Sequence, residues 1–412
     1  MKKAIIVGGS MGGLLAGNML IRQGWAVEIV ERTREGLEAR GAGIVPQRSL
    51  LAALKRAGVI VRPDIGIHIQ KRVAYDRAGN VFATHGYEQY ATSWSLLYGL
   101  LRKNFPAEHF HAGGNVAEVT QDRCGAAVVL SDGSKLEGDL VIGADGMRST
   151  VRGALFPEIQ PRYVGYLAWR GMLEERDATP KFVEACFSAL NFSFPDGEEL
   201  IGYPVAGPDS SVEPGKRRFN IMWYRPVSPG VELRDMFTGV DGVYYEHGVP
   251  PSRVRRELIT AMKKEAHQLF PPAFANVIER MQGMFVQAIY ELESESVGRG
   301  RVAIIGDAAF VARPHCGAGV SKAADDAVSL SDSLEKNDRV EDAVVAFSAA
   351  RTVAGRAAVK WAAHLGSYFQ MDQTGHRRAD FDSKRPPVSP EFIIKHTGIE
   401  LSEVSKDMMC LG

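Results

Sequence analysis

Short apolar runs separated by glycine-rich turns give the first indication of the fold. Residues 4–7, 27–30 and 302–305 are brief runs rich in isoleucine and valine, which is typical of buried strands. Residues 14–22 and the alanine-rich segment that starts at Val320 each follow a glycine turn, and we expect both to be helices. The order of buried strand, glycine turn and helix predicts a parallel sheet with helices packed on it.

The middle of the chain follows a different pattern. Between residues 165 and 293, apolar and polar positions alternate, as in Phe219-Asn-Ile-Met-Trp-Tyr224, and proline–glycine turns separate the runs. Such alternation is typical of an antiparallel sheet with one covered face and one open face. Helices are expected at 250–270 and 272–281 in the same region, and at 340–364 further along.

These patterns predict an α/β protein, α+β overall, with two sheets and a set of C-terminal helices. A Rossmann-like domain with a parallel sheet is expected from three segments: 1–70, 93–164 and 294–370. An antiparallel-sheet domain is expected from 71–92 and 165–293. The tail, 371–412, is polar and then proline-rich, and a short helix is expected at 392–399. It either lies against a partner subunit or forms a loosely held end.

Composition narrows the class of protein. Lysine plus arginine and aspartate plus glutamate are balanced at 49 each, so no net charge attracts nucleic acid or an anionic membrane. The four cysteines are scattered, which favours reduced thiols in the cytoplasm, and no spacing of ligands suggests a metal. Lys2-Lys3 before an apolar run imitates a signal peptide, but glycines and early charges interrupt it. No run approaches the roughly 18 apolar residues of a membrane span. We expect a cytoplasmic monomer or homodimer.

The first sixty residues have the order of a dinucleotide-binding unit, which is strand, glycine turn, helix and strand. Gly8 permits a tight turn, and Gly13 lets the helix approach the strand. Ser10 stands where the usual pattern has its second glycine, and it is small enough for a pyrophosphate to approach. Glu31 closes the second strand, where it can bind a ribose diol. The alternative is a glycine-rich turn with a solvent-facing Glu31.

In two later stretches, a strand again ends close to an acidic residue. In the first, a hairpin at Asp132-Gly133 precedes a strand that ends in Gly143-Ala-Asp145-Gly146, and Ser149 and Arg152 then share a helix face. In the second, Arg301–Ala327, a strand runs into Gly306-Asp307. A loop with Pro314 follows, and then the start of a helix. The free N–H groups of that helix would attract an anionic or carbonyl group. Ordinary α/β scaffolding is the alternative for this second stretch.

Together the three stretches resemble the three signatures of the single-component flavoprotein aromatic hydroxylases. This is the para-hydroxybenzoate hydroxylase-like family of FAD- and NAD(P)H-dependent monooxygenases. The signatures occur in the order of the family and span most of the chain, from Gly8 to Val320. Three positions depart from the wider family: Phe310 replaces a frequent histidine, Ser321 a frequent asparagine, and Trp94 a common arginine.

The resemblance implies a set of residues that bind FAD. The ADP half would be held by Gly8, Ser10, Gly13 and Glu31, and the ribityl and pyrophosphate region by Asp307. Pro314 and the backbone of Gly317, Ala318, Gly319 and Val320 would lie against the isoalloxazine. Asp145, Gly146 and Arg152 would form the signature linked to both FAD and NAD(P)H. Further cofactor-binding residues are expected at Gly12, Arg32, Gly43, Gln47 and Gly306.

The resemblance also implies the reaction. NADPH or NADH would reduce the flavin, which then reacts with O2 to give a C4a-hydroperoxide. This intermediate hydroxylates a small electron-rich aromatic, such as a hydroxylated pyridine or related N-heteroaromatic. A phenolic or hydroxybenzoate-type substrate and a catalytically silent flavin-binding protein are the alternatives. The W-x-W-x-I-P signature of flavin-dependent halogenases does not occur in the chain.

Catalytic and substrate-binding candidates follow from this reaction. The protein must exclude water, orient the ring and help to deprotonate the substrate hydroxyl. His315 is the main candidate for the base, because it follows Pro314 and titrates in a suitable range. A loop histidine bonded to backbone is its alternative. Arg313, Arg170 and Arg225 could stabilise an anionic substrate, with a surface position as the alternative for each, and Tyr203 is a second candidate for the base. His315 is also expected to face the substrate. The aromatic residues expected against the substrate, with core packing as the alternative for each, are Trp169, Tyr203, Trp223 and Tyr224.

Overall fold

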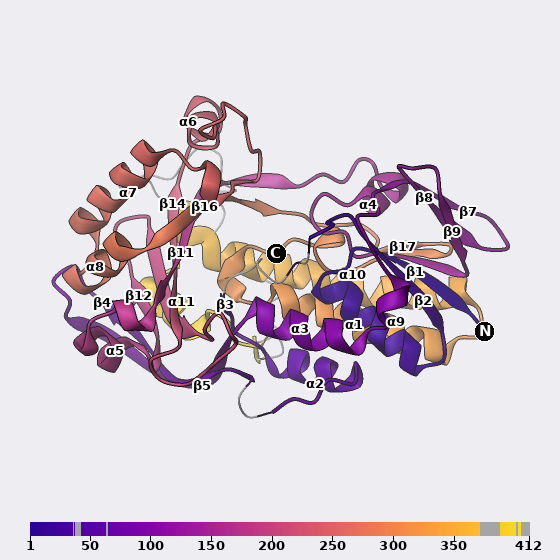
Figure 1. Ribbon diagram of the computed structural model, residues 1–412, viewed down its shortest axis with the longest axis horizontal. Helices are drawn as coiled ribbons and strands as arrows, with labels where there is room; N and C mark the ends of the chain where they lie inside the picture. The colour runs from indigo at the N-terminus through magenta and orange to yellow at the C-terminus, as the bar shows by residue number, and fades with distance from the viewer. Residues whose placement is uncertain (36, 38–42, 63–64, 371–387, 401–402, 405–412) are drawn as a thin grey trace.

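The computed structural model of the chain describes all residues except 36, 38–42, 63–64, 371–387, 401–402 and 405–412. It has two lobes side by side along its long axis (Figure 1). One lobe is built on a six-stranded, mostly parallel sheet, and the other on a nine-stranded sheet. None of the helices within the described residues is both long and apolar enough to cross a bilayer.

The six-stranded sheet forms the centre of the lobe on the right of Figure 1. β1 pairs in parallel with both β2 and β10, and β10 pairs in parallel with β18, so the sheet is parallel except at the β17 edge. The predicted buried strands are confirmed as β1, β2, β10 and β18. In spatial order the strands are β17 (Gly298–Arg299), β18 (Val302–Ile304), β10 (Leu140–Gly143), β1 (Lys3–Val7), β2 (Ala26–Glu31) and β6 (Phe110–Ala112).

Long helices pack on this sheet and on one another. α9 contacts α1, α2 and α10, and α1 also contacts α3. The helices are α1 (Met11–Arg22), α2 (Arg48–Arg56), α3 (Trp94–Asn104), α9 (Gly319–Lys336) and α10 (Val340–Leu365). α1 begins earlier than the predicted 14–22, so Gly12 and Gly13 lie inside the helix and not in the turn before it. The predicted helix at 340–364 is confirmed as α10.

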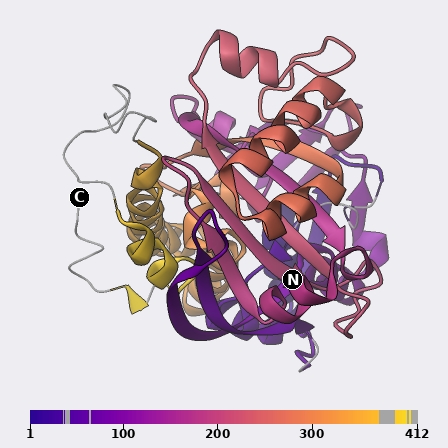
Figure 2. The ribbon, with the colours of Figure 1, turned by 90° about the vertical axis from the view of Figure 1, so that its left-hand side faces the viewer.

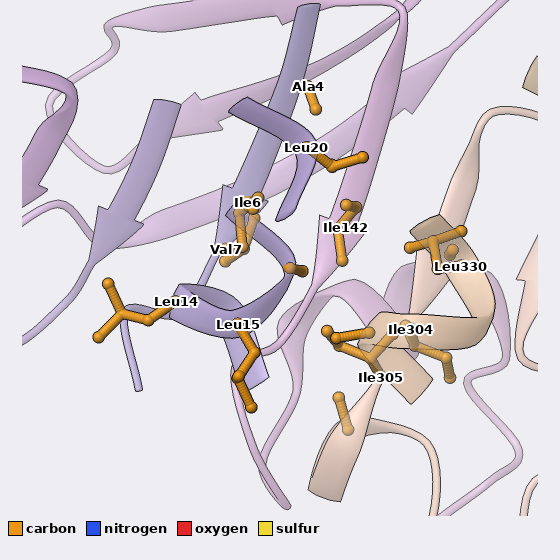
Figure 3. Packing of buried hydrophobic residues seen from close by; sticks show 14 of the residues in the cluster. Ala4, Ile6, Val7, Leu14, Leu15, Leu20, Ile142, Ile304, Ile305 and Leu330 are labelled. Atoms are coloured by element: carbon orange, nitrogen blue, oxygen red, sulfur yellow. The ribbon is translucent and has the colours of Figure 1, made fainter. Parts of the chain in front are cut away.

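The core of this lobe lies between the parallel sheet and α1 and α9 (Figure 3). Ile6 and Ile142 from the sheet, Leu15 from α1 and Leu330 from α9 are each at most 1% exposed. Full burial of one such side chain contributes roughly 1.5–3 kcal/mol to the free energy of unfolding. This packing fixes the ends of β1, β10 and β18, from which the three motif loops emerge.

The nine-stranded sheet is mixed and not purely antiparallel as predicted. β12 and β4 run in the same direction and pair in parallel, whereas the other pairs are antiparallel. In spatial order the strands are β15 (Gly248–Val249), β16 (Gln282–Glu291), β11 (Arg162–Glu174), β14 (Arg218–Pro226), β13 (Glu199–Val205), β12 (Ala189–Ser193), β4 (Ile67–Tyr75), β5 (Val81–Ser93) and β3 (Gly43–Ile44).

Helices cover one face of the nine-stranded sheet, as Figure 2 shows for α7 and α8. These helices are α5 (Pro180–Cys186), α6 (Val231–Met236), α7 (Arg256–Leu269) and α8 (Pro272–Arg280). The face on the other side carries Tyr166 and Ala168 of β11, Tyr203 of β13 and Tyr224 of β14, which share one core cluster. We call it the inner face. The period of two along a strand sends Trp169 and Trp223 to the helix-covered face.

The remaining elements are small. A three-stranded sheet consists of β7 (Val116–Gln121), β8 (Ala126–Leu130) and β9 (Lys135–Gly138), and the predicted Asp132-Gly133 turn joins the last two, with φ of 86° at Gly133. α4 covers Thr150–Leu155 and α11 covers Pro390–His396. Short 3-10 turns occur at Ala107–His109, Glu175–Asp177, Pro251–Arg253, Gly306–Ala308, Pro314–Cys316 and Gly366–Gln370. The division of the chain into two domains and a tail stays a prediction, and much of the tail lies outside the described residues.

Candidate active site

The first glycine turn brings β1, α1 and β10 into close contact. A Cβ atom on Gly8, whose φ is 106°, would lie 2.3 Å from the carbonyl oxygen of Ala144. A Cβ atom on Gly13 would lie 1.9 Å from the carbonyl oxygen of Gly8. Glycine is therefore required at both positions, as the motif predicts.

Glu31 lies at the end of β2 and faces this turn. Its Oε2 accepts a hydrogen bond of 2.8 Å from the N–H of Gly9, and its Oε1 accepts one of 2.9 Å from the N–H of Thr33. The residue is buried, so the alternative of a solvent-facing Glu31 is wrong. Two backbone donors hold the carboxylate beside the glycine turn, where a ribose diol would reach it.

A cavity of about 200 Å³ opens at the ends of β1, β2 and β10. The predicted residues that line it are Gly8, Ser10, Glu31, Arg32, Asp145 and Gly146. Trp94, Asn115 and Arg148 also line it, and they were not predicted as cofactor-binding. Asn115 could have been found from its place just after β6, at the same end of the parallel sheet, where ligands of this fold bind.

Asp145 lines this cavity and also stabilises the start of α4. Its carboxylate accepts hydrogen bonds from the Ser149 hydroxyl at 2.5 Å and from the N–H of Thr150 at 2.7 Å, which caps the first turn of α4. Ser149 in turn accepts the N–H of Arg152 at 2.8 Å. Burial raises the pKa of Asp145, and the hydrogen bonds that it accepts oppose this shift. Asp145 therefore shapes the loop that contacts the cavity.

Arg152 does not reach the cavity, contrary to the prediction that it binds cofactor. Its buried guanidinium donates to the backbone carbonyls of Met147 at 2.6 Å, Ala308 at 3.1 Å and Ile159 at 3.3 Å. Backbone carbonyl oxygens thus accept the hydrogen bonds that the Arg152 guanidinium would otherwise donate to a phosphate. The bond to Ala308 ties the second motif stretch to the third.

Charged side chains on α9 and α10 form a hydrogen-bonded group that holds the third motif stretch in place. Asp326 Oδ2 accepts the N–H of Gly306 at 2.9 Å, and Lys322 Nζ donates to the carbonyl oxygen of Gly306 at 2.7 Å. Arg351 Nε donates to the second oxygen of Asp326 at 2.7 Å. Lys322 and Asp326 are each 1% exposed. This group, here called the Gly306 clamp (Lys322, Asp326 and Arg351), was not predicted.

The clamp presents Asp307 to a second cavity. The Asp307 side chain is exposed and lines this cavity. The removal of bulk water raises the pKa of Asp307, Lys322 opposes the shift, and the nearby charge of Asp326 adds to it. A carboxylate in this position can accept hydrogen bonds from the hydroxyls of a polyol chain.

The second cavity, of about 220 Å³, lies between the Asp307 loop and the inner face. Pro314 lines it on the loop side, and Ala168, Arg170 and Tyr224 line it on the sheet side. A larger hollow of about 890 Å³ adjoins it, and Arg170 and Gln287 line both. Arg170 Nη1 donates to Gln287 Oε1 at 3.1 Å between the two. The face that the sequence predicts to be open is partly covered, because C-terminal residues such as Phe369 and Ile393 pack on it.

His315 lies behind this cavity and not in it. The ring is 1% exposed and packs against Tyr224 and Phe369, with centroid distances of 4.7 and 4.8 Å. Its Nε2 lies 2.8 Å from the hydroxyl oxygen of Tyr166, and its Nδ1 lies 3.5 Å from Oε2 of the buried Glu199. The placement contradicts a direct role as the base, because the ring is buried and does not line the cavity, whereas Tyr224, on which it packs, does. The alternative of a histidine bonded to backbone is also wrong, since its neighbours are side chains.

Two further catalytic candidates, Arg313 and Tyr203, make contacts that do not suit a catalytic role. Arg313 is buried, and its Nε donates to Glu291 Oε2 of β16 at 2.8 Å, so its charge is already paired. Burial raises the pKa of Tyr203 to about 12, so the phenol stays protonated at neutral pH and cannot act as a base. Its ring lies against Gly43, where a Cβ atom would come within 2.4 Å of Tyr203 Cε2.

The predicted substrate aromatics divide between the two faces of the sheet. Tyr224 lines the second cavity and stays a candidate. Trp169 and Trp223 are at most 1% exposed in the core under the covering helices, and Trp223 Nε1 donates to Glu198 Oε2 at 2.5 Å. We therefore remove both tryptophans from the candidate site, and core packing is the correct interpretation for them.

The turn before α9 has the features expected of a carbonyl-binding loop. Gly317 adopts a φ of 59°, and α9 begins at Gly319 with no side-chain hydrogen bond to cap it within the described residues. A segment near the C-terminus lies on this turn, since a Cβ atom on Gly317 would be 3.0 Å from Gly398 Cα. Gln47, predicted to bind cofactor, instead donates to the Ile399 carbonyl at 2.7 Å and holds this segment.

These features fit FAD. The glycine turn and Glu31 suit the ADP half, and Asp307 suits the polyol chain. The first turn of α9, which no side chain among the described residues caps, offers N–H groups for a carbonyl edge. The sequence profile of a family described as FAD binding domain-like matches residues 163–291. Fold and site together define an FAD-binding oxidoreductase.

Relatives specify the class further. The chain is 30% identical over 369 residues to 2,6-dihydroxypyridine 3-monooxygenase of Paenarthrobacter nicotinovorans, covering 89% of this chain and 91% of that protein. The chain therefore belongs to the family of FAD-dependent monooxygenases that hydroxylate aromatic and heteroaromatic rings, and it is a flavoprotein enzyme of this family. Local stretches such as Val164–Gly171 and Ile201–Gly207 already resemble this relative in sequence.

Solved structures agree with this assignment. The structure of 2,6-dihydroxypyridine-3-hydroxylase from Arthrobacter nicotinovorans superposes with a TM-score of 0.85 at 27% identity, over 94% of this chain and 99% of that one. The structure of Klebsiella pneumoniae HpxO complexed with FAD and uric acid has a TM-score of 0.71 at 20% identity, over 90% of this chain and 88% of that one, and shows the shared fold. The α/β fold with a parallel sheet, a second sheet and C-terminal helices is thus that of the FAD monooxygenases.

Proposed function

We propose that this enzyme uses NADPH or NADH and O2 to hydroxylate a small hydroxylated N-heteroaromatic of the hydroxypyridine type. The observation that carries the proposal is the second cavity, which lies between the Asp307–Pro314 loop and the inner face. A flat ring placed there would have Tyr224 on the sheet side and the expected position of the flavin on the loop side. The substrate named for the relative from Paenarthrobacter nicotinovorans is a dihydroxypyridine.

FAD, when bound, supplies the oxygen-activating chemistry, and the chain supplies binding, orientation and electrostatics. Gly8, Ser10 and Glu31 would hold the ADP half, and Asp307 would accept hydrogen bonds from the ribityl hydroxyls. The uncapped first turn of α9 would favour negative charge at the edge of the ring that it faces. These residues fix the position of the flavin relative to the substrate.

Arg170 is the cationic side chain of the second cavity. Hydroxylation beside a ring hydroxyl is easier when that hydroxyl has lost its proton, because the anion makes the neighbouring carbon nucleophilic. A guanidinium next to the ring stabilises this anion and orients it. Apolar neighbours such as Ala168, Ile289 and Val311 exclude water from the same space.

We further propose that the enzyme acts in the cytoplasm, as a monomer or homodimer. The support is the state of the cysteines, because Cys124, Cys186 and Cys316 are all free thiols within the part of the chain that the structure describes.

The test is the oxidation of NADPH and NADH by the FAD-loaded enzyme, with O2 uptake measured in parallel. A panel of hydroxypyridines and phenols is compared with a no-substrate blank, and the products are identified by mass. We expect hydroxypyridines to stimulate oxidation and to gain one oxygen atom. If no aromatic in the panel stimulates oxidation, the proposal is wrong. If phenols alone do so, the substrate class is phenolic.

A further inference from the structure

Asn220 carries a buried carboxamide whose hydrogen-bonding atoms have no partner among the described residues. The residue lies on β14 and is 0% exposed, and neither its Oδ1 nor its Nδ2 is hydrogen-bonded. Asn191, on β12 and equally buried, shows the usual arrangement, since its Nδ2 donates to the carbonyls of Cys186, Ala189 and Gly202. A buried amide without partners opposes folding, so such a group calls for an explanation.

The register of the sheet places Asn220 on the inner face, in the same row as candidate site residues. Asn220 is opposite Met172 on β11 and opposite Tyr203 on β13. Tyr224, four residues along the same strand, lines the second cavity. Asn220 lines the hollow of about 890 Å³ that adjoins that cavity. The residue therefore stands in the wall of a space that a ligand can fill.

Arg170 provides the second polar group at this place. It is opposite Met222, the inner-face neighbour of Asn220 on β14, and it lines both the cavity and the hollow. Its Nη1 is bonded to Gln287, while its buried Nε has no partner among the described residues. Met172 and Phe285 form an apolar wall beside the two groups, while charged side chains line other parts of the hollow. An amide and a guanidinium beside such a wall are suited to a flat, polar-edged ring.

We propose that Asn220 recognises the lactam edge of the substrate, and that Arg170 pairs with a ring oxygen beside it. A carboxamide offers one acceptor and one pair of donors side by side, which complements an adjacent ring N–H and C=O. Hydroxypyridines present this edge in their pyridone tautomers, whereas a phenol of the same shape has no ring N–H. The inference rests on the proposed function and adds to it the residue by which the enzyme would bind pyridones in preference to phenols.

The chemistry of this contact makes it selective. A phenol bound in the same place would leave the Asn220 carbonyl oxygen buried and unpaired. Sites that hydrogen-bond a polar substrate group reject analogues without that group more strongly than apolar pockets reject a change in size.

The test compares two ligands that differ at one ring position, 2,6-dihydroxypyridine and resorcinol. Their dissociation constants are measured on the FAD-loaded enzyme from the change in flavin absorbance. We expect wild type to bind the dihydroxypyridine at least about tenfold more tightly than resorcinol. The near-isosteric Asn220→Leu should bring the two constants to within about twofold of each other. Its melting temperature should be equal to or above that of wild type, because an unpaired buried amide has been removed.

Ile221→Val is the matched control. Ile221 is the next residue on β14 and faces the covering helices, so its truncation perturbs the strand without touching the hollow. It should keep the wild-type ratio of the two dissociation constants. An unchanged ratio in Asn220→Leu, with or without a lower melting temperature, overturns the inference and identifies a structural amide. That result leaves the proposed function intact if hydroxypyridines still stimulate NAD(P)H oxidation. The function itself is refuted if no aromatic stimulates NAD(P)H oxidation by the wild-type enzyme.

Discussion

Asp307 is the carboxylate that the structure presents most openly to the candidate site. The cleft around it raises its pKa, so the folded protein binds a proton at Asp307 more readily than the unfolded chain does. The stability that comes from this difference is fully present below the unfolded pKa and is lost as the pH rises through the folded pKa. Ionisation of Asp307 therefore lowers the stability of the apoprotein, and hydrogen bonds from bound FAD would offset this loss.

Asp307→Asn tests this trade-off. We expect the apoprotein of the variant to melt above wild type at pH 7, and this advantage should shrink as the pH falls through the carboxyl range. FAD affinity should fall by about tenfold, since one charge-assisted hydrogen bond is lost. Thermal melts across pH and FAD titration by flavin fluorescence measure the two effects. Tighter FAD binding, or a stability gain that grows at low pH, would contradict the role given to Asp307.

Single residues also show where sequence reasoning succeeds and where it stops. Gly8, Gly13 and Glu31 are predictable because the turn, the close helix and the strand end are all local to one motif. Trp223 and Tyr224 are adjacent aromatics, and only the register of β14 decides which one faces the hollow. The neighbours of His315 lie on β11, β13, β14 and the turn Gly366–Gln370, so the sequence could place the loop but not the direction of the ring.

At the scale of elements, the Gly306 clamp connects α9 and α10 to the third motif loop. Asp326 accepts from both Gly306 and Arg351, so its loss leaves Arg351 without its buried carboxylate partner. Breaking a buried charge pair on one side typically costs about 3–5 kcal/mol. The sequence shows Asp325 and Asp326 side by side, and only helix packing distinguishes the inward carboxylate from its neighbour.

We predict that Asp326→Asn lowers the free energy of unfolding by about 3 kcal/mol, as measured by urea denaturation. Asp325→Asn is the matched control, because Asp325 lies on the same turn and is only half-buried. It should change the free energy of unfolding by less than about 1 kcal/mol. Equal effects of the two substitutions would show that the clamp does not hold the loop.

A buried cation helps to hold α11 on the nine-stranded sheet, in addition to the apolar packing of Ile393 and Ile394. Arg72 of β4 is 0% exposed, and its Nη1 donates to the carbonyls of Ile394 and Lys395, both at 2.9 Å. Its Nη2 donates to Gln89 at 3.0 Å, and burial lowers its pKa to about 10. The sequence left open whether the tail serves a partner subunit. The described part around α11 lies on its own chain.

Arg72→Met should release α11 from the sheet. Two helix carbonyls would lose a charged donor, a loss of about 1.5–3 kcal/mol per bond before relaxation. Hydrogen exchange should become faster in Pro390–His396, while exchange in β1 and β10 stays as in wild type. Lys71→Met, at the exposed neighbouring position, is the control and should leave α11 protected. Unchanged exchange in α11 of Arg72→Met would contradict the anchoring role.

At the scale of the whole molecule, the two lobes meet where the motif loops face the hollow side of the second sheet. The parallel sheet supplies the loops at the ends of β1, β10 and β18, and the second sheet supplies Arg170, Asn220 and Tyr224. The pattern of the chain predicts both sheets and the fold class. It does not predict the parallel pairing of β12 with β4, because strand order depends on contacts between residues far apart in sequence.

We propose that the enzyme transfers one oxygen atom from O2 to a hydroxypyridine. The mass of the product formed by the FAD-loaded enzyme from 2,6-dihydroxypyridine and NADH or NADPH under 18O2 tests this transfer. We expect a product with one added oxygen atom, and that atom should carry the label. An unlabelled oxygen, or NAD(P)H consumed only to form hydrogen peroxide with the substrate unchanged, would contradict it.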